Sequence, residues 1–102
     1  MSAVLLIEDD ERLRRALALT LRSRGYEVAD AGTGAESLAW LQRSRVDVIV
    51  LDLGLPDIDG IDLISSIREV QQAPIVVLSA RRDQSDKVRA LDAGADDYVT
   101  KP

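Results

Sequence analysis

The chain has 102 residues, of which 46% are hydrophobic and 30% charged, and this composition is typical of one globular domain with a single core. It contains no Cys and no His, which excludes disulfides, thiolate metal sites and any chemistry that needs an imidazole of its own. With 13 basic and 18 acidic residues the formal charge is −5, which disfavours binding to nucleic acid by this chain alone. We expect a cytoplasmic protein, because no apolar run approaches the ~18 residues of a membrane span and no signal peptide is evident.

The chain begins with a short apolar run at 3–7, and three acidic residues follow it at 8–10. A continuous apolar run that ends in charged residues is typical of a strand buried on both faces of a parallel sheet. Apolar residues then recur at intervals of three and four, which predicts a helix over about 11–24. Asp10 is its expected N-cap, and Gly25 is expected to end it.

A second strand is predicted at 26–29. Thr33 stands three residues before a glutamate, which is the spacing of a capping box, so a second helix is predicted at about 35–43. The run at 46–51 has the strongest strand composition in the chain, and it ends at Asp52. A Gly-Leu-Pro-Asp stretch after it excludes regular structure there.

A third helix is predicted after Asp59 and Gly60, and it should end near Arg68. The residues after this helix predict a fourth strand at 75–78. This strand leads directly to Ser79.

The fourth predicted helix has the weakest apolar pattern. Asp83 or Ser85 can cap it, Gly94 ends it, and a short fifth strand at 96–99 precedes Lys101. Its apolar residues are few: Val88, Ala90 and Leu91. This sparse stripe is compatible both with an element that shifts at little cost and with a poorly packed surface helix.

Strands and helices alternate throughout, which predicts an α/β fold: a doubly wound sheet of five parallel strands joined by right-handed crossovers. No helix follows the fifth strand, so one face near that edge of the sheet lacks a cover. We expect either that the natural chain continues past 102, so that the final helix is missing here, or that a partner covers this face.

Polar groups stand where four of the strands end. In open parallel sheets, ligands bind beyond the carboxyl ends of the strands. The first strand delivers Glu8 and Asp9, the third Asp52, the fourth Ser79 and the fifth Lys101. Because several carboxylates close together need a cation, and because Mg²⁺ prefers oxygen ligands, a magnesium site is predicted at this edge.

Each of these residues also has an ordinary structural interpretation. An acid after a strand is often an N-cap, and this is the ordinary interpretation of Asp9 taken alone. A lysine before a proline is usually solvated, and Asp57 and Asp59 are expected to serve turn and cap chemistry around Gly60. The joint placement of suitable groups at four strand ends nevertheless favours a metal-assisted phosphoryl site.

The spacing of the residues argues against other known kinds of binding or catalytic site. The chain has neither a P-loop nor a Gly-x-Gly-x-x-Gly motif, so a nucleotide or dinucleotide site is not supported. A calcium loop would place Leu55 and Ser66 at two ligand positions, which excludes it. A haloacid-dehalogenase-type phosphatase would need a second aspartate where the chain has Gly54.

Four segments resemble the receiver domain of two-component response regulators, and together they cover nearly the whole chain. They read LIEDD at 6–10, VLDLGLPD at 50–57, VLSA at 77–80 and GADDYVTKP at 94–102. The resemblance implies a flavodoxin-like sheet of order 2-1-3-4-5, with residues 1–102 as a C-terminally truncated receiver.

The resemblance also implies a phosphoryl-accepting site. Asp52 would accept a phosphoryl group from the phosphohistidine of a sensor histidine kinase. Glu8 and Asp9 would form the acidic pair, and Asp9, Asp52 and the Gly54 carbonyl would hold Mg²⁺. Lys101 would contact the phosphoryl oxygens, and no reaction beyond the domain's own phosphorylation and dephosphorylation is expected.

A switch is implied as well. Ser79 would move inward to contact the phosphoryl group, and Tyr98 would then rotate from an exposed to a buried position and reshape the fourth helix. A cis peptide bond between Lys101 and Pro102 is implied, and it would aim the ammonium group into the site.

The segment at 77–102 further resembles the branch of regulators that carry a winged-helix DNA-binding domain, and 52–60 with 79–87 resembles the regulators of the Kdp potassium-transport operon. DNA would be bound only through an effector domain, which this chain lacks. The full-length protein would dimerise through the fourth helix and fifth strand, and no membrane contact is expected. Two other functions stay open: a metal-dependent phosphatase with Asp52 as nucleophile, and an interaction module that works without phosphorylation.

Overall fold

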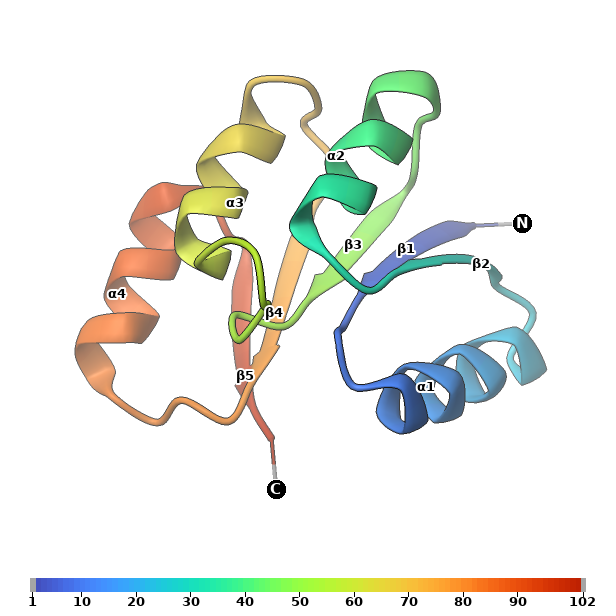
Figure 1. The fold of residues 1–102 in the computed structure, drawn as a ribbon, viewed down its shortest axis with the longest axis horizontal. Helices are drawn as coiled ribbons and strands as arrows, with labels where there is room; N and C mark the ends of the chain where they lie inside the picture. Colours follow the sequence, from blue (N-terminus) through green and yellow to red (C-terminus); the bar gives the residue numbers. More distant parts are fainter. Residues whose placement is uncertain (1, 102) are drawn as a thin grey trace.

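Five parallel strands form one sheet in the order β2-β1-β3-β4-β5, which confirms the predicted order (Figure 1). The structure is a computed structural model that describes residues 2–101. The strands are β1 (Ala3–Ile7), β2 (Glu27–Ala31), β3 (Val48–Leu51), β4 (Ile75–Ser79) and β5 (Asp97–Thr100). The helices are α1 (Glu11–Ser23), α2 (Gly34–Arg43), α3 (Gly60–Arg68) and α4 (Gln84–Ala93).

Helix starts follow the local sequence closely. The side chains of Asp10, Thr33, Asp59 and Asp83 each accept a backbone N–H of the first turn that they precede, so the expected N-caps are confirmed. Gly94 ends α4 with a φ of +125°, a conformation that residues with a side chain rarely adopt.

Several strands begin or end at other residues than the sequence predicts, because hydrogen bonds with neighbouring turns and strands determine their limits. β2 begins one residue later than predicted, since the Tyr26 amide donates to Leu21 O at 3.2 Å and closes the turn after α1. β2 then continues to Ala31, which pairs with Ile7 at the end of β1. The amide of Asp47 bonds to β1, but regular pairing of β3 begins only at the next residue.

The main core lies between the sheet and the layer of α2, α3 and α4, whereas α1 packs on the opposite face against β1 and β2 (Figure 1). β3 and β4 contribute alternate residues to this core, namely Ile49, Leu51, Ile75 and Val77, all of which are fully buried. Side chains alternate between the two faces of a strand, so their neighbours point to the side of α1.

The α1 side of the sheet is covered less completely over β3, β4 and β5. Val50, Val76 and Leu78 are only partly buried there, and Val99 is 45% exposed. Within residues 2–101, this half of the face therefore keeps apolar surface in contact with solvent.

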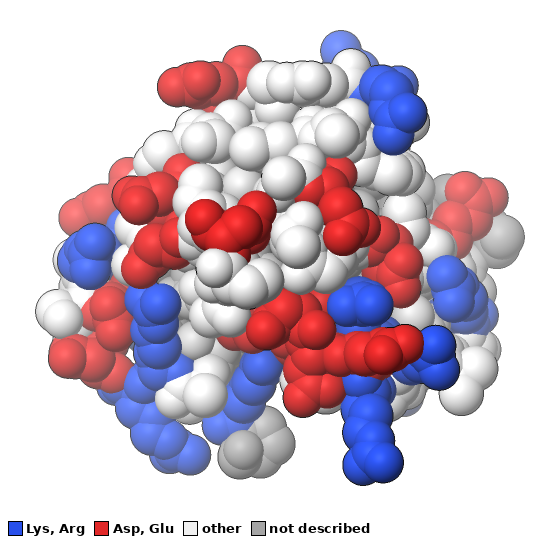
Figure 2. Space-filling model, viewed as in Figure 1, with Lys and Arg blue, Asp and Glu red and all other residues white. Residues whose placement is uncertain are grey.

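Acidic side chains spread across the middle of the face shown in Figure 2, and most of the Lys and Arg side chains lie nearer its edges. Among the described residues, no helix is both long and apolar enough to cross a membrane.

Candidate functional site

β1 and β3 are neighbours at the centre of the sheet, and their carboxyl ends form the floor of the site. Ile7 pairs with Leu51 in the last register of the two strands, and the Asp52 amide donates to Ile7 O at 2.9 Å. The chain runs to β2 on one side of β1 and to β3 on the other, so this point is the topological switch of the sheet. Glu8 and Asp52 are therefore brought side by side by strand pairing alone.

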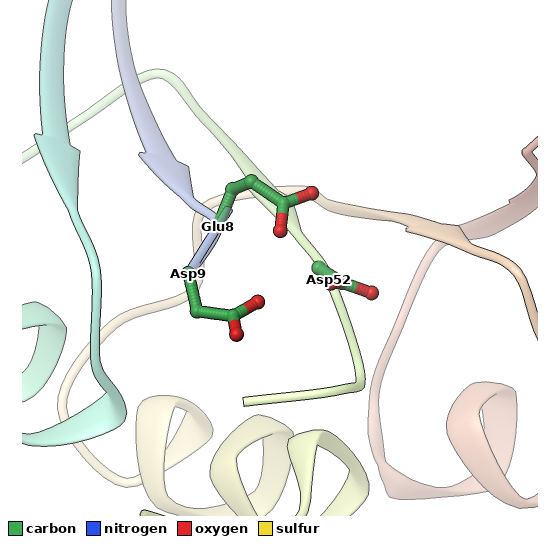
Figure 3. A group of neighbouring side chains, drawn as sticks. All are labelled: Glu8, Asp9 and Asp52. Atoms are coloured by element: carbon green, nitrogen blue, oxygen red, sulfur yellow. The ribbon is translucent and has the colours of Figure 1, made fainter. Parts of the chain in front are cut away.

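Three carboxylates meet at this point (Figure 3). Glu8 and Asp9 extend from the end of β1 and Asp52 from the end of β3, and one carboxylate oxygen of each lies within 4.8 Å of the other two. Glu8 is 2% exposed, the Asp52 side chain is 11% exposed, and Asp9 is open to solvent. Clustered carboxylate oxygens with one open side fit a hard divalent cation such as Mg²⁺, which keeps several of its waters.

Lys101 completes the site from the far end of the chain. Its Nζ lies 2.8 Å from Glu8 Oε1 and 3.3 Å from Asp52 Oδ2, and its side chain is 20% exposed. The pairing of β5 with β4 positions this residue, because the Lys101 amide donates to Ser79 O at 2.7 Å. The predicted convergence of acids and ammonium group is thus found in the fold.

Burial and charge shift the protonation of two groups here. Burial raises the pKa of Glu8, and the negative charge of Asp52 adds to this, while hydrogen bonds from Lys101 and from the Asp10 amide only partly offset the rise. Burial alone would lower the pKa of Lys101, but its hydrogen bond to Glu8 and the charge of Asp52 outweigh burial and raise it. The ammonium group therefore stays charged at neutral pH between two carboxyl groups.

Gly54 lies beside Asp52 in the loop between β3 and α3, and its amide donates to Asp52 Oδ1 at 3.3 Å. A Cβ on Gly60 would lie 2.5 Å from the Leu53 Cα, so a side chain there would displace the backbone next to Asp52. The close contact between Gly60 and Leu53 thus fixes the loop that follows Asp52.

The position of Asp57 corrects the sequence-based expectation. We predicted that it serves the turn around Gly60, but its carboxylate accepts the amides of Gly34 at 2.8 Å and Ala35 at 3.0 Å. It therefore caps α2 from another loop. Ile58 packs beside it where a Cβ on Gly34 would stand, so this loop rests directly on the start of α2.

Ser79 and Tyr98 are both buried, at 1% and 9% exposure. Ser79 Oγ accepts the Arg81 amide at 3.1 Å, and Tyr98 Oη donates to Arg81 O at 2.7 Å. We expected Tyr98 to begin exposed, and this is wrong for the described structure. A buried phenol needs a partner for its hydroxyl group, and the Arg81 carbonyl supplies one. The peptide bond between Lys101 and Pro102 lies outside the described residues.

Sequence reasoning missed two side chains around the site. Asp57 was expected to serve the turn around Gly60, but it caps α2. Arg81 contacts Asp59 and Asp86, and the sequence predicted no function for it. No local pattern marks either residue, because their partners belong to other loops and helices.

Comparisons with known proteins agree with this geometry. A family model described as the response regulator receiver domain matches residues 4–102. The transcriptional regulatory protein KdpE of Mycobacterium tuberculosis is 55% identical over 102 residues, which are 100% of this chain and 45% of that protein. The expected similarity to Kdp-type regulators is thereby confirmed.

Two solved structures share the fold along the full chain. A response regulator from Burkholderia pseudomallei, solved with a phosphorylated aspartic acid, a calcium ion and citrate, is 33% identical with a TM-score of 0.95, covering 100% of this chain and 61% of that one. TrrA from Thermotoga maritima, solved in complex with Mg²⁺ and BeF, is 30% identical with a TM-score of 0.90, covering 100% and 88%. With its acidic strand ends, its sheet order and these matches, the chain belongs to the response regulator receiver domain family.

Proposed function

We propose that Asp52 accepts a phosphoryl group from the phosphohistidine of a sensor histidine kinase and that the receiver's own residues catalyse the transfer. The observation that carries this proposal is the placement of Asp52 between an acidic pair and a lysine. Its Oδ2 lies 3.3 Å from Lys101 Nζ, and its carboxylate lies within 4.8 Å of those of Glu8 and Asp9. A titratable cluster of this kind at a topological switch point supports phosphoryl chemistry.

In the proposed transfer, a carboxylate oxygen of Asp52 attacks phosphorus in line with the leaving group. The oxygen–phosphorus bond forms while the nitrogen–phosphorus bond breaks, and its electron pair stays on the imidazole nitrogen of the kinase. Lys101 would stabilise negative charge on the phosphoryl oxygens. The chain needs no histidine of its own for this step, because the donor supplies it.

Glu8, Asp9 and Asp52, with the carbonyl of Gly54, would hold a divalent cation, for which we propose Mg²⁺. When bound, this ion would neutralise charge on the transferred group. The relatives solved with Ca²⁺ or Mg²⁺ support a cation of this type.

We further propose that Ser79 and Tyr98 form the switch. The product carries about −1.5 to −2 charges, and its oxygens need hydrogen-bond donors. The Ser79 hydroxyl group accepts the Arg81 amide, so its own proton is free to be donated toward Asp52. Because Tyr98 is already buried, phosphorylation would act by holding a ring position that the unphosphorylated protein already samples.

The partners of the whole protein are also proposals, since the chain spans 45% of the length of its KdpE relative. We propose a cytoplasmic transcriptional regulator in which 1–102 is the receiver and a separate effector domain binds DNA. Val88 and Leu91 of α4 are exposed and β5 is the edge strand of the sheet, which supports dimerisation through the face of α4 and β5 in the full-length protein.

The α1 side of the sheet is incompletely covered over β3, β4 and β5. Val50, Val76, Leu78 and Val99 stay partly exposed on it. We propose that a helix from the region after Lys101 covers them. Proteins that include this region should then resist denaturant better than residues 1–102 alone.

The test is incubation of the domain with acetyl phosphate and Mg²⁺, followed by intact-mass measurement. We expect one added phosphoryl group that hydroxylamine removes, as for an acyl phosphate, and no label on the Asp52→Asn variant. Stable labelling of Asp52→Asn would mean that another residue is the acceptor. Multiple turnover of a free phosphomonoester would favour a phosphatase, and a folded protein that takes neither Mg²⁺ nor phosphate would favour an interaction module.

A further inference from the structure

The side chain of Arg81 joins the two loops that border the site. Arg81 lies between β4 and α4. Its Nη2 is 3.4 Å from Asp59 Oδ2 at the start of α3 and 3.5 Å from Leu53 O, and its Nη1 is 3.8 Å from Asp86 Oδ1 in α4. Leu53 directly follows Asp52. One guanidinium group therefore contacts the loop of the central aspartate and the first turns of two helices.

The backbone of the same residue holds both members of the proposed switch. The Arg81 amide donates to Ser79 Oγ at 3.1 Å, and its carbonyl accepts the Tyr98 hydroxyl at 2.7 Å. Ser79 and Tyr98 are both buried, so a displacement of this peptide would leave polar groups without partners. Ser79 therefore cannot move far without Arg81, and Arg81 cannot move far without Tyr98.

We propose that Arg81 is a positioning residue that couples the state of Asp52 to the burial of Tyr98 and the placement of α4. This inference rests on the proposed function. The guanidinium group holds the loop between β4 and α4 against Asp59, and the Tyr98 ring stays inward while that contact lasts. A phosphoryl group on Asp52 that draws Ser79 toward itself moves the Arg81 peptide, and the bond to Tyr98 carries the movement to β5.

The chain offers variants that separate this role from general stability. Asp59→Asn keeps a side-chain oxygen for the cap that Asp59 Oδ1 now gives to the Ile61 amide, but it removes the charge that faces Arg81. Arg81→Ala removes the guanidinium group, and Arg81→Lys keeps its charge. Arg82 is exposed, and no ion pair of its side chain is found within residues 2–101, so Arg82→Ala is a matched control.

The readout is the exposure of the Tyr98 ring. The chain has two tyrosines, so 3-fluorotyrosine in a Tyr26→Phe background labels Tyr98 alone. The change of its ¹⁹F shift between H₂O and D₂O reports solvent access, both without ligand and at saturation with Mg²⁺ and beryllofluoride. Thermal unfolding of each variant is measured in parallel.

We expect the Arg81→Ala variant to bind beryllofluoride, because its carboxylates are intact. Without ligand, its ratio of buried to exposed Tyr98 should be about two- to fivefold lower than in the parent protein, which is the size of effect that the loss of a partly exposed ion pair predicts. Asp59→Asn should produce the same change, Arg81→Lys should restore part of the ratio, and Arg82→Ala should match the parent. The double variant with Arg81→Ala and Asp59→Asn should add little to either single one.

The inference is overturned if Arg81→Ala and Asp59→Asn lower the unfolding temperature yet leave the Tyr98 ratio unchanged with and without ligand. An equal change in Arg82→Ala would overturn it too. If Arg81→Ala does not fold, Asp59→Asn and Arg81→Lys decide between the same outcomes. If the parent protein binds no beryllofluoride, the proposed function falls together with the inference, whereas binding with an unchanged Tyr98 response removes the inference alone.

Discussion

The ammonium group of Lys101 lies 2.8 Å from Glu8 Oε1, although 93 positions separate the two residues in the sequence. The same nitrogen lies 3.3 Å from Asp52 Oδ2, so one cation balances part of the negative charge of the site. Lys101 can do this because β5 pairs in parallel with β4, so that its carboxyl end lies at the same edge of the sheet as those of β1 and β3. The proposed acceptor is thus held in an ion cluster before any ligand arrives.

Removing this ammonium group tests its role in the transfer. In Lys101→Met, a neutral side chain of similar length replaces the cation, and the rate of labelling by acetyl phosphate should fall about 10²- to 10³-fold, as for loss of one preorganised group that stabilises charge. Intact-mass time courses measure the rate, and Lys101→Arg should retain part of it. A wild-type rate in Lys101→Met would show that the ammonium group takes no part in the reaction.

Metal addition and removal test the carboxylate cluster. Mg²⁺ at 100 times its Kd should stabilise the folded protein by about 2.7 kcal/mol, and EDTA should reverse the rise in Tm. Asp9→Asn should lose this response while unfolding at or above the wild-type temperature without metal, because Asp9 is exposed and its neutralisation lessens repulsion among the three carboxylates. Calorimetric scans with and without Mg²⁺ measure both effects. An undiminished Mg²⁺ response in Asp9→Asn would remove this residue from the ligand set.

The cap that Asp57 provides to α2 predicts a pH dependence of stability. Hydrogen bonds from the Gly34 and Ala35 amides lower the pKa of Asp57 below its ordinary value of 3.8. Because the folded state favours the ionised form of Asp57, the cap stabilises the folded protein above pH 3.8, and this stabilisation is lost as the pH falls through the lowered pKa. Asp57→Asn keeps one acceptor oxygen, so its Tm should lie below the wild-type value at pH 7, and the gap should narrow toward pH 3. Melting curves followed by circular dichroism measure the gap, and the exposed Asp92→Asn is the control; a gap that stays constant with pH would contradict the ionic cap.

Gly54, in the loop after β3, and Gly60, at the start of α3, should differ in how much stability they lose when replaced by alanine. In Gly60→Ala the new Cβ would meet the Leu53 Cα at 2.5 Å, so the backbone must shift, at a cost of about 1–3 kcal/mol. In Gly54→Ala the nearest atoms are the Asp52 carboxylate oxygens at 3.8 and 3.9 Å, which is ordinary contact, so the change should stay within about 0.5 kcal/mol. Urea unfolding compares the two variants, and equal losses would refute the close approach of Gly60.

The hydroxyl group of Tyr98 should contribute to stability more than to phosphorylation. Tyr98→Phe removes the 2.7 Å hydrogen bond to Arg81 O and should cost about 0.5–1.5 kcal/mol. Labelling of Asp52 by acetyl phosphate should keep its wild-type rate, since the Tyr98 hydroxyl group bonds to Arg81 O and, among the described residues, to none of the three carboxylates. Tyr26→Phe, at an exposed position, is the matched control for both measurements. A large loss of labelling in Tyr98→Phe would instead give this hydroxyl group a part in the chemistry.

Much of the fold could be predicted because its signals are local. The apolar runs and helical spacing gave nine elements in the right order for the described residues, and the N-caps at Asp10, Thr33 and Asp59 bond to amides two or three positions away. The strand ends were less accurate. Tyr26 belongs to the turn after α1 and β2 continues to Ala31, because pairing with other segments decides where a strand begins and ends.

The sequence by itself determined which chemical groups stand at the strand ends, since residue types and periodicity are properties of short stretches. Tertiary structure alone decided that Lys101 contacts Glu8, that Asp57 caps α2, and that Arg81 holds a buried Tyr98. Each of these contacts joins residues from different loops or strands. Their distances depend on how the crossovers stack the elements, and no local pattern encodes that packing.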